Sequence, residues 1–189
     1  MGASRATRVA MTPAMTPAMN PAINIAIRAA APADLPLIAS LIRALAEYEK
    51  LAHEVRFDEA VLGAKLFGPR PYAEVIIGEL DGAPQGFALF FHNFSTFEGK
   101  PGIYLEDLFV QPAARGSGLG TALLAHLAKL AVERDCARLE WSVLDWNTPS
   151  IGFYHALGAR SLSDWTGMRL DGAGLERLGE IGAKFTGMR

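Results

Sequence analysis

The sequence predicts an α+β protein in three layers (α/β/α), with one mixed, mostly antiparallel sheet between helices that cover both of its faces. Two observations lead to this fold class. Residues 72–94 contain two apolar runs joined by Asp81-Gly82, which is the pattern of an antiparallel hairpin. Two strand-then-helix units follow, starting near residues 102 and 137, and such units need helices on both sides of a sheet.

The first half of the chain supplies the first strand and two helices. Residues 23–30 (INIAIRAA) alternate apolar and polar side chains like a half-buried strand. Asp34 then precedes a helical pattern over residues 35–51, with Pro36 in its first turn. Residues 57–67 predict a second, shorter helix. The hairpin comes next.

The second half continues with the strand 102–110 and a glycine-rich turn that leads into a long helix. One face of that helix is apolar, with Leu123, Leu124, Leu127, Leu130 and Ala131. Residues 137–145 predict a strand. A short helix over 148–158 follows, with Thr148 as N-cap, Pro149 at its first position and Gly158 at its end. Residues 168–172 (MRLDG) predict a final strand.

Composition describes one ordinary globular domain, which we expect over residues 23–189. Half of the 189 residues are hydrophobic and a fifth are charged. Residues 1–22 contain a Met-Thr/Asn-Pro-Ala repeat, so we expect a disordered tail, more consistent with an extended start than with an organellar presequence. The single cysteine, Cys136, cannot form an intramolecular disulfide, which favours a reducing compartment and a cytoplasmic protein.

Charge and hydropathy argue against two classes of partner. The net charge of -2 gives no general attraction for nucleic acid or for an anionic membrane surface. No apolar run approaches the roughly 18 residues that a membrane-spanning helix needs. The four histidines show no spacing typical of a metal site, so we expect no metal. Because the net charge gives no general attraction for phosphates, any phosphate binding must be local.

The glycine-rich turn is the strongest local signal for a bound anion. Arg115, Gly116, Gly118 and Gly120 stand directly before the long helix, and glycine lets the backbone approach a phosphate at a helix N-terminus. The dinucleotide fingerprint fails because Thr121 occupies its third glycine position, and a nucleotide-triphosphate loop fails because no Gly-Lys-Ser/Thr follows. A tight turn with no ligand remains the plain alternative for the glycines alone.

The pattern Arg115-x-x-Gly118-x-Gly120 resembles the coenzyme A diphosphate loop of the Gcn5-related N-acetyltransferase (GNAT) superfamily. Residues 103–124 (IYLEDLFVQPAARGSGLGTALL) and 142–159 (SVLDWNTPSIGFYHALGA) resemble its diamine acetyltransferase branch, including thialysine-acetylating members. The resemblance covers about residues 23–175. It implies the GNAT fold, acetyl-coenzyme A as co-substrate without a metal, a small-molecule amine as acceptor, and a homodimer.

The resemblance also implies the residues that bind the coenzyme. It assigns backbone contacts to Leu108 and Val110, while Asn147 and Ser150 touch the pantetheine arm, although Asn147 could act only as a turn residue. The full set of expected coenzyme contacts is Leu108, Phe109, Val110, Arg115, Gly116, Ser117, Gly118, Leu119, Gly120, Thr121, Asn147, Ser150 and Tyr154.

Transfer of an acetyl group to an amine needs a base for the amine and an acid for the departing thiolate. The resemblance makes Tyr154 the acid, since a phenol is protonated at neutral pH. The alternative is a tyrosine packed in the core beside Phe153. Glu106 and Asp107 are consecutive in a strand, so we expect them on opposite faces. The resemblance assigns Glu106 to the amine, as base or through a water, while Asp107 contacts the substrate or braces the loops.

The acceptor side of the resemblance involves Tyr48 and Glu49, which match a Tyr-Glu pair that helps to bind a cationic substrate in the diamine branch. An aromatic face beside a carboxylate suits an alkylammonium, although Glu49 could also lie on a solvated helix face. Residues 95–102 (STFEGKPG) depart from the acidic Asp-Pro-Trp loop of polyamine acetylating enzymes. A short ω-amino acid or a diamine is therefore expected ahead of polyamines and of a protein N-terminus.

Two other functions remain open at this point. The first is a non-catalytic sensor of acyl-coenzyme A, which would need neither Tyr154 nor Glu106. The second is a nicotinamide-dependent oxidoreductase, which the glycine spacing disfavours.

Overall fold

The computed structural model describes residues 23–186, in two compact units that comprise residues 23–142 and 143–186. The first unit holds the sheet. Its elements are β1 (Ile25–Ala29), α1 (Leu35–Tyr48), α2 (Glu59–Phe67), β2 (Glu74–Leu80), β3 (Ala83–Ser95), β4 (Lys100–Val110), α3 (Leu119–Glu133) and β5 (Leu139–Trp141). Short 3₁₀ turns at Pro32–Asp34, Ala52–Glu54 and Pro112–Ala114 lead into or out of the helices.

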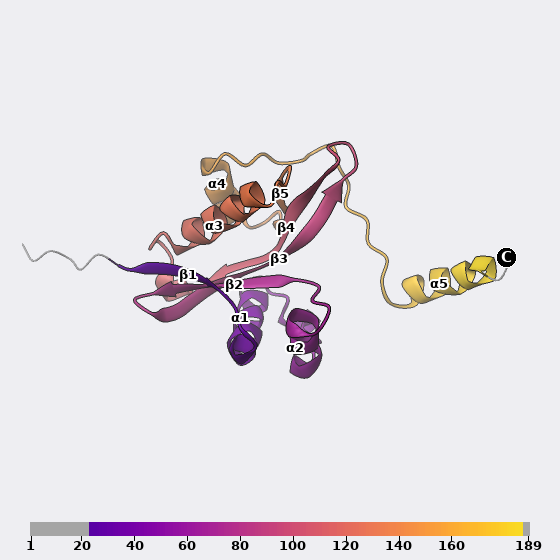
Figure 1. Ribbon diagram of the computed structural model, residues 1–189, viewed down its shortest axis with the longest axis horizontal. Coiled ribbons are helices and arrows are strands. Elements are labelled where there is room, and N and C mark those ends of the chain that lie inside the picture. The colour runs from indigo at the N-terminus through magenta and orange to yellow at the C-terminus, as the bar shows by residue number, and fades with distance from the viewer. Residues whose placement is uncertain (1–22, 187–189) are drawn as a thin grey trace, which may run out of the picture. The chain divides into compact units, whose positions relative to one another are not determined.

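The described residues form one sheet in the order β1-β2-β3-β4-β5. The first three pairings are antiparallel, and β4 and β5 are parallel. In Figure 1, α1 and α2 lie on one face of this sheet and α3 lies on the other. The predicted fold class is confirmed, including the hairpin, which turns at Asp81 and Gly82 with positive φ at both residues.

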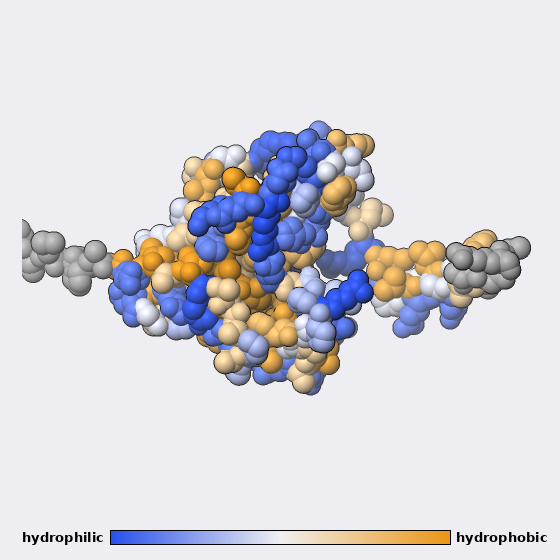
Figure 2. Space-filling model, viewed as in Figure 1, coloured by the Kyte–Doolittle hydropathy of each residue, from blue (hydrophilic) through white to orange (hydrophobic). Residues whose placement is uncertain are grey.

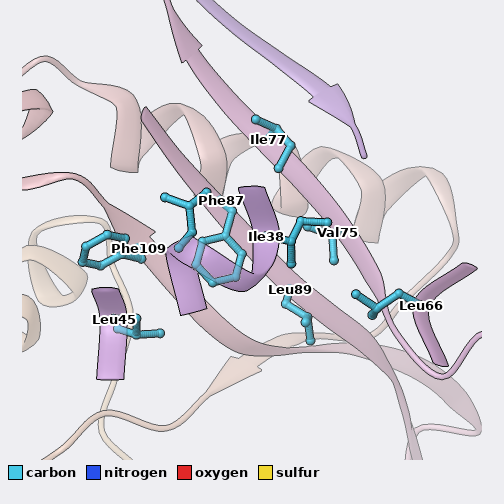
Figure 3. Close-up of a cluster of buried hydrophobic side chains, with 9 residues drawn as sticks. Ile38, Leu45, Leu66, Val75, Ile77, Phe87, Leu89 and Phe109 are labelled. Atoms are coloured by element: carbon cyan, nitrogen blue, oxygen red, sulfur yellow. The ribbon is translucent and has the colours of Figure 1, made fainter. Parts of the chain in front are cut away.

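The core under α1 explains why the apolar residues of that helix repeat every three or four positions. Ile38, Leu41 and Leu45 are buried against side chains of β2, β3 and β4. Figure 3 shows Phe87 at the centre of this cluster, whose buried members are Ile38, Leu41, Leu45, Leu66, Val75, Ile77, Phe87, Leu89 and Phe109. Burial of each such side chain contributes roughly 1.5–3 kcal/mol, so this cluster holds α1 firmly on the sheet.

On the opposite face, α3 buries Leu119, Leu123, Leu124, Leu127 and Ala131, whereas Leu130 is only half-buried. The start of this helix approaches β2 closely. A Cβ atom at Gly78 would lie 2.9 Å from Cδ1 of Leu119, so glycine is needed there. This contact fixes the beginning of α3, and with it the glycine turn, against the sheet.

The second unit contains α4 (Thr148–Ala156) and α5 (Gly172–Thr186). Asn147, not Thr148, is the N-cap of α4, because its buried side chain accepts a hydrogen bond from the Ser150 N–H at 3.4 Å. Pro149 is accordingly the second helical residue. The helix ends as predicted before Gly158, whose φ is +91°.

The final strand predicted at residues 168–172 is wrong, since no strand forms there and α5 follows instead. A strand needs a partner, whereas the apolar residues of α5 repeat at helical spacing. Leu175, Leu178, Ile181 and Phe185 are all exposed, and Figure 2 shows apolar side chains along one side of α5 and hydrophilic ones along another.

None of the helices described is both long enough and apolar enough to cross a membrane. The predicted tail, residues 1–22, lies outside the described residues.

Candidate active site

The turn before α3 has the backbone that the glycine pattern predicts. Gly116 has a φ of +78° and Gly118, the N-cap of α3, has a φ of +92°, conformations that favour glycine. The first hydrogen bond of the helix runs from the Ala122 N–H to the Gly118 carbonyl. Because helical bonding begins only there, the N–H groups of Gly120 and Thr121 have no partner in the described part of the chain. These groups and the helix dipole can hold an anion.

Arg115, an exposed residue, lies between this turn, β4 and the end of α1. Its Nε donates a hydrogen bond to the Val110 carbonyl at 3.2 Å. The guanidinium carbon lies 4.3 Å from the centre of the Tyr48 ring and 5.9 Å from that of Phe109. No partner for its two Nη groups occurs among the residues described, so the outer end of the guanidinium can bind a phosphate.

At the level of the candidate site, no strand of the described residues pairs with one edge of β4. β5 pairs only with Ile103, Tyr104 and Leu105, and it ends at Trp141, so the strand predicted over residues 137–145 is shorter than expected. On the other edge, the Gln111 N–H donates to Gln85 at 2.8 Å and continues the ladder with β3.

This ladder sets the direction of the neighbouring amides. In an antiparallel pair, hydrogen-bonded and non-bonded positions alternate. Val110 and Leu108 are therefore at non-bonded positions opposite Gly86 and Ala88. Their N–H groups point away from β3, toward the edge of β4 that β5 covers only at residues 103–105.

Glu106 is the extra residue of a β-bulge that the sequence analysis did not anticipate. β3 pairs Leu89 with Asp107 but the next residue, Phe90, with Leu105. Leu105 and Asp107 therefore face opposite sides of the sheet although they are two residues apart. Glu106 is left without a cross-strand partner and is exposed, and such bulges commonly re-aim a side chain beside an active site.

Asp107 lies on the α1 face of the sheet, where the charges of two other carboxylates act on it. Burial, together with the charges of Glu106 and Glu49, raises the pKa of Asp107 from its ordinary 3.8 to about 6. Burial also raises the pKa of Glu49, at the C-cap of α1. The structure thus brings Glu49 of α1 and the Glu106-Asp107 pair of β4 into one acidic cluster.

The other predicted residues divide between the two units. Tyr48, Ser117 and the glycine turn belong to the first unit, where the side chains of Phe109 and Leu119 are buried in the core and can offer a ligand only their backbone. Asn147, Ser150 and Tyr154 belong to the second unit, and the ring centres of Phe153 and Tyr154 are 5.4 Å apart. Across residues 23–186, no group of three His, Cys, Asp or Glu side chains could hold a metal ion.

The site also contains features that the sequence analysis missed. Stacking of Arg115 on Tyr48 joins residues 67 positions apart, and no spacing rule connects them. The sequence could have predicted Asn147 as the N-cap, because asparagine is a strong capping residue and here it stands directly before Thr-Pro. Apart from the two adjacent acidic residues, nothing in the sequence indicated the bulge.

Comparisons with known proteins agree with this geometry. The profile of the acetyltransferase (GNAT) family matches residues 39–159. The thialysine N-epsilon-acetyltransferase of Bos taurus is 38% identical over 152 residues, which cover 75% of this chain and 89% of the relative. The L-ornithine N5-acetyltransferase of Arabidopsis thaliana is 30% identical, in a match that covers 76% of this chain and 83% of that relative.

A solved structure extends the comparison to the fold. An integron cassette protein from the mobile metagenome of V. cholerae superposes with a TM-score of 0.70 at 27% identity, and the match covers 82% of this chain and 98% of that one. The family resemblance is confirmed: this chain belongs to the acetyltransferase (GNAT) family and is an acetyl-coenzyme A-dependent N-acetyltransferase.

Proposed function

We propose that this enzyme acetylates the primary amine of a short cationic molecule, a thialysine-like ω-amino acid or a diamine. The acidic cluster of Glu49, Glu106 and Asp107 carries the proposal, since a cationic acceptor would relieve the repulsion among these carboxylates. The two relatives are named for thialysine and ornithine, which are both short cationic amines and so belong to the proposed substrate class. Longer polyamines and protein N-termini are expected to be poorer acceptors.

The residues of the first unit fit acetyl-coenzyme A. The free N–H groups of Gly120 and Thr121 and the outer end of Arg115 would hold the diphosphate, helped by the open backbone at Gly116, Ser117 and Gly118. The N–H groups of Leu108 and Val110 would bind the thioester carbonyl and the pantetheine amides. Asn147 and Ser150 are proposed to contact the pantetheine arm. When bound, the coenzyme supplies the activated acetyl group.

The reaction is direct attack within a ternary complex. Asp107 and Glu49 hold the cationic acceptor, and Glu106 removes a proton from the attacking nitrogen, directly or through one water. A nitrogen–carbon bond forms and the carbon–sulfur bond breaks. The Tyr154 hydroxyl gives its proton to the departing sulfur, which leaves as a thiol. The roles of Glu106 and Tyr154 rest on the family resemblance of their motifs.

An amine panel tests the proposed acceptor. Purified protein is incubated with acetyl-coenzyme A and thialysine, ornithine, 1,3-diaminopropane, spermidine or a peptide with a free N-terminus, and release of free thiol is followed. The proposal requires the first three to be the best acceptors by kcat/KM. Coenzyme binding in a thermal-shift assay without thiol release for any amine would instead identify a sensor of acyl-coenzyme A.

We also propose that the enzyme works in the cytoplasm as a homodimer that binds neither nucleic acid nor membranes. The dimer rests on the family resemblance, and the reducing compartment fits a sequence whose one cysteine cannot pair within the chain. Light scattering during size-exclusion chromatography tests the dimer, and elution at the mass of one chain would contradict it.

A further inference from the structure

The contact between Arg115 and Tyr48 links the two sides of the site. Arg115 precedes the glycine turn that is proposed to bind the coenzyme, whereas Tyr48 is the last residue of α1 and adjoins Glu49 of the acidic cluster. The guanidinium carbon lies 4.3 Å above the Tyr48 ring. This distance is well within the range of cation–π attraction.

Two contacts together fix the orientation of the Arg115 side chain. The Val110 carbonyl accepts the Nε proton at 3.2 Å, and the Tyr48 ring supports the flat face of the guanidinium. With both contacts in place, the plane of the guanidinium is set and its Nη groups remain available. An arginine held in this way loses less side-chain freedom when it binds a phosphate than one that is free in solvent.

The Tyr48 ring is itself held in place by the core. Tyr48 packs against the core cluster that holds α1 to the sheet. Because Leu45, one turn earlier in α1, is buried in that cluster, the ring is anchored from its own helix. Arg115, by contrast, is exposed and belongs to a loop. Tyr48 is thus the fixed partner and Arg115 the one that needs positioning.

We infer that Tyr48 is a positioning residue for the coenzyme: its ring orders Arg115 for the diphosphate, so the end of α1 serves the coenzyme through Tyr48 and the amine through Glu49. The inference rests on the proposed role of Arg115 in coenzyme binding. It gives the Tyr48 ring a role in donor affinity in place of direct contact with the acceptor amine.

The test compares Tyr48→Leu, which removes the aromatic face, with Tyr48→Phe, which keeps it. Calorimetric titration with coenzyme A should show affinity about 2–5-fold weaker for Tyr48→Leu, the equivalent of an exposed cation–π contact. Tyr48→Phe should restore most of the affinity. The effect should vanish in an Arg115→Ala background, because only a ring that acts through Arg115 loses its effect there.

A matched control is available in the same unit. Tyr72 is exposed and lies under Lys65 at 5.0 Å, a similar cation–π pair between other elements. Tyr72→Leu should leave coenzyme affinity unchanged. Melting temperatures of all variants show whether each one is folded.

Kinetics separate this inference from the alternative. Positioning of Arg115 predicts a higher KM for acetyl-coenzyme A in Tyr48→Leu, with the KM for the amine altered much less. A higher amine KM with unchanged coenzyme affinity, or an equal effect with and without Arg115, would overturn the inference. If no amine is acetylated, the proposed acceptor fails, while the calorimetric cycle still decides the role of Tyr48.

Discussion

Replacement of Asp107 by asparagine should make the protein more stable and less active. The carboxylate is half-buried, the charges of Glu106 and Glu49 act on it, and its pKa is raised to about 6. The folded protein therefore holds the Asp107 proton more tightly than the unfolded chain does. Ionisation of this group opposes folding, and the wild type loses stability as the pH rises from about 4 through 6.

The size of the effect follows from the two pKa values. The difference between the ordinary 3.8 and about 6 corresponds to about 3 kcal/mol at 1.36 kcal/mol per pK unit. By the linkage relation, this penalty is complete at pH 8 and falls below about 1 kcal/mol at pH 4, where both states hold the proton more equally. Asparagine is uncharged at every pH, so Asp107→Asn should be free of the penalty.

Urea unfolding at pH 8 and pH 4 measures the difference. We expect the free energy of unfolding of Asp107→Asn, relative to the wild type, to be about 2–3 kcal/mol larger at pH 8 than at pH 4. Asp164→Asn, at an exposed carboxylate in the second unit, is the matched control and should show no such difference. Equal relative stability of Asp107→Asn at both pH values would refute the reasoning.

Three further predictions concern the charges, the acid and the turn. Glu49→Gln removes a charge that raises the pKa of Asp107. If ionised Asp107 binds the acceptor, the acidic limb of the kcat/KM profile should move below pH 6, and an unchanged limb would show that the Glu49 charge does not act on Asp107 during the reaction. Tyr154→Phe should lower kcat by roughly 10²-fold with coenzyme affinity intact, as measured by stopped assay and titration, and equal turnover would remove Tyr154 as the acid. Gly118→Ala places a side chain at a φ of +92° and should cost about 1–2 kcal/mol in urea unfolding; no loss would mean that the turn relaxes freely.

The elements that the sequence predicted well are those whose pattern is local. The apolar face of α3 and the turn at Asp81-Gly82 each follow from residues within one segment. The glycine turn was equally readable, because positive φ at Gly116 and Gly118 is a property of single residues. The family motif then connected that turn to a coenzyme.

The elements that it missed depend on partners far along the chain. Residues 168–172 alternate apolar Met168 and Leu170 with polar residues, but alternation does not supply a neighbouring strand, and none pairs with them among residues 23–186. The short reach of β5 depends likewise on where the chain leaves the sheet after Trp141. Local propensity is a weak guide whenever the other half of a contact decides the outcome.

The bulge at Glu106 shows why this limit matters most at the active site. Strict alternation would have put Leu105 and Asp107 on the same face of the sheet. Asp107 would then lie on the α3 side, as Leu105 does opposite Phe90. With Glu106 as the extra residue, Asp107 lies instead on the α1 face, where the charge of Glu49 acts on it, and Glu106 is exposed without a cross-strand partner. Removal of Glu106 would restore the regular register, with Leu105 opposite Phe90 and Asp107 opposite Leu89, so Asp107 would stay on the α1 face and only the exposed carboxylate would be lost. The bulge therefore explains how Leu105 can be buried on the α3 side while Asp107, two positions later, lies on the α1 side.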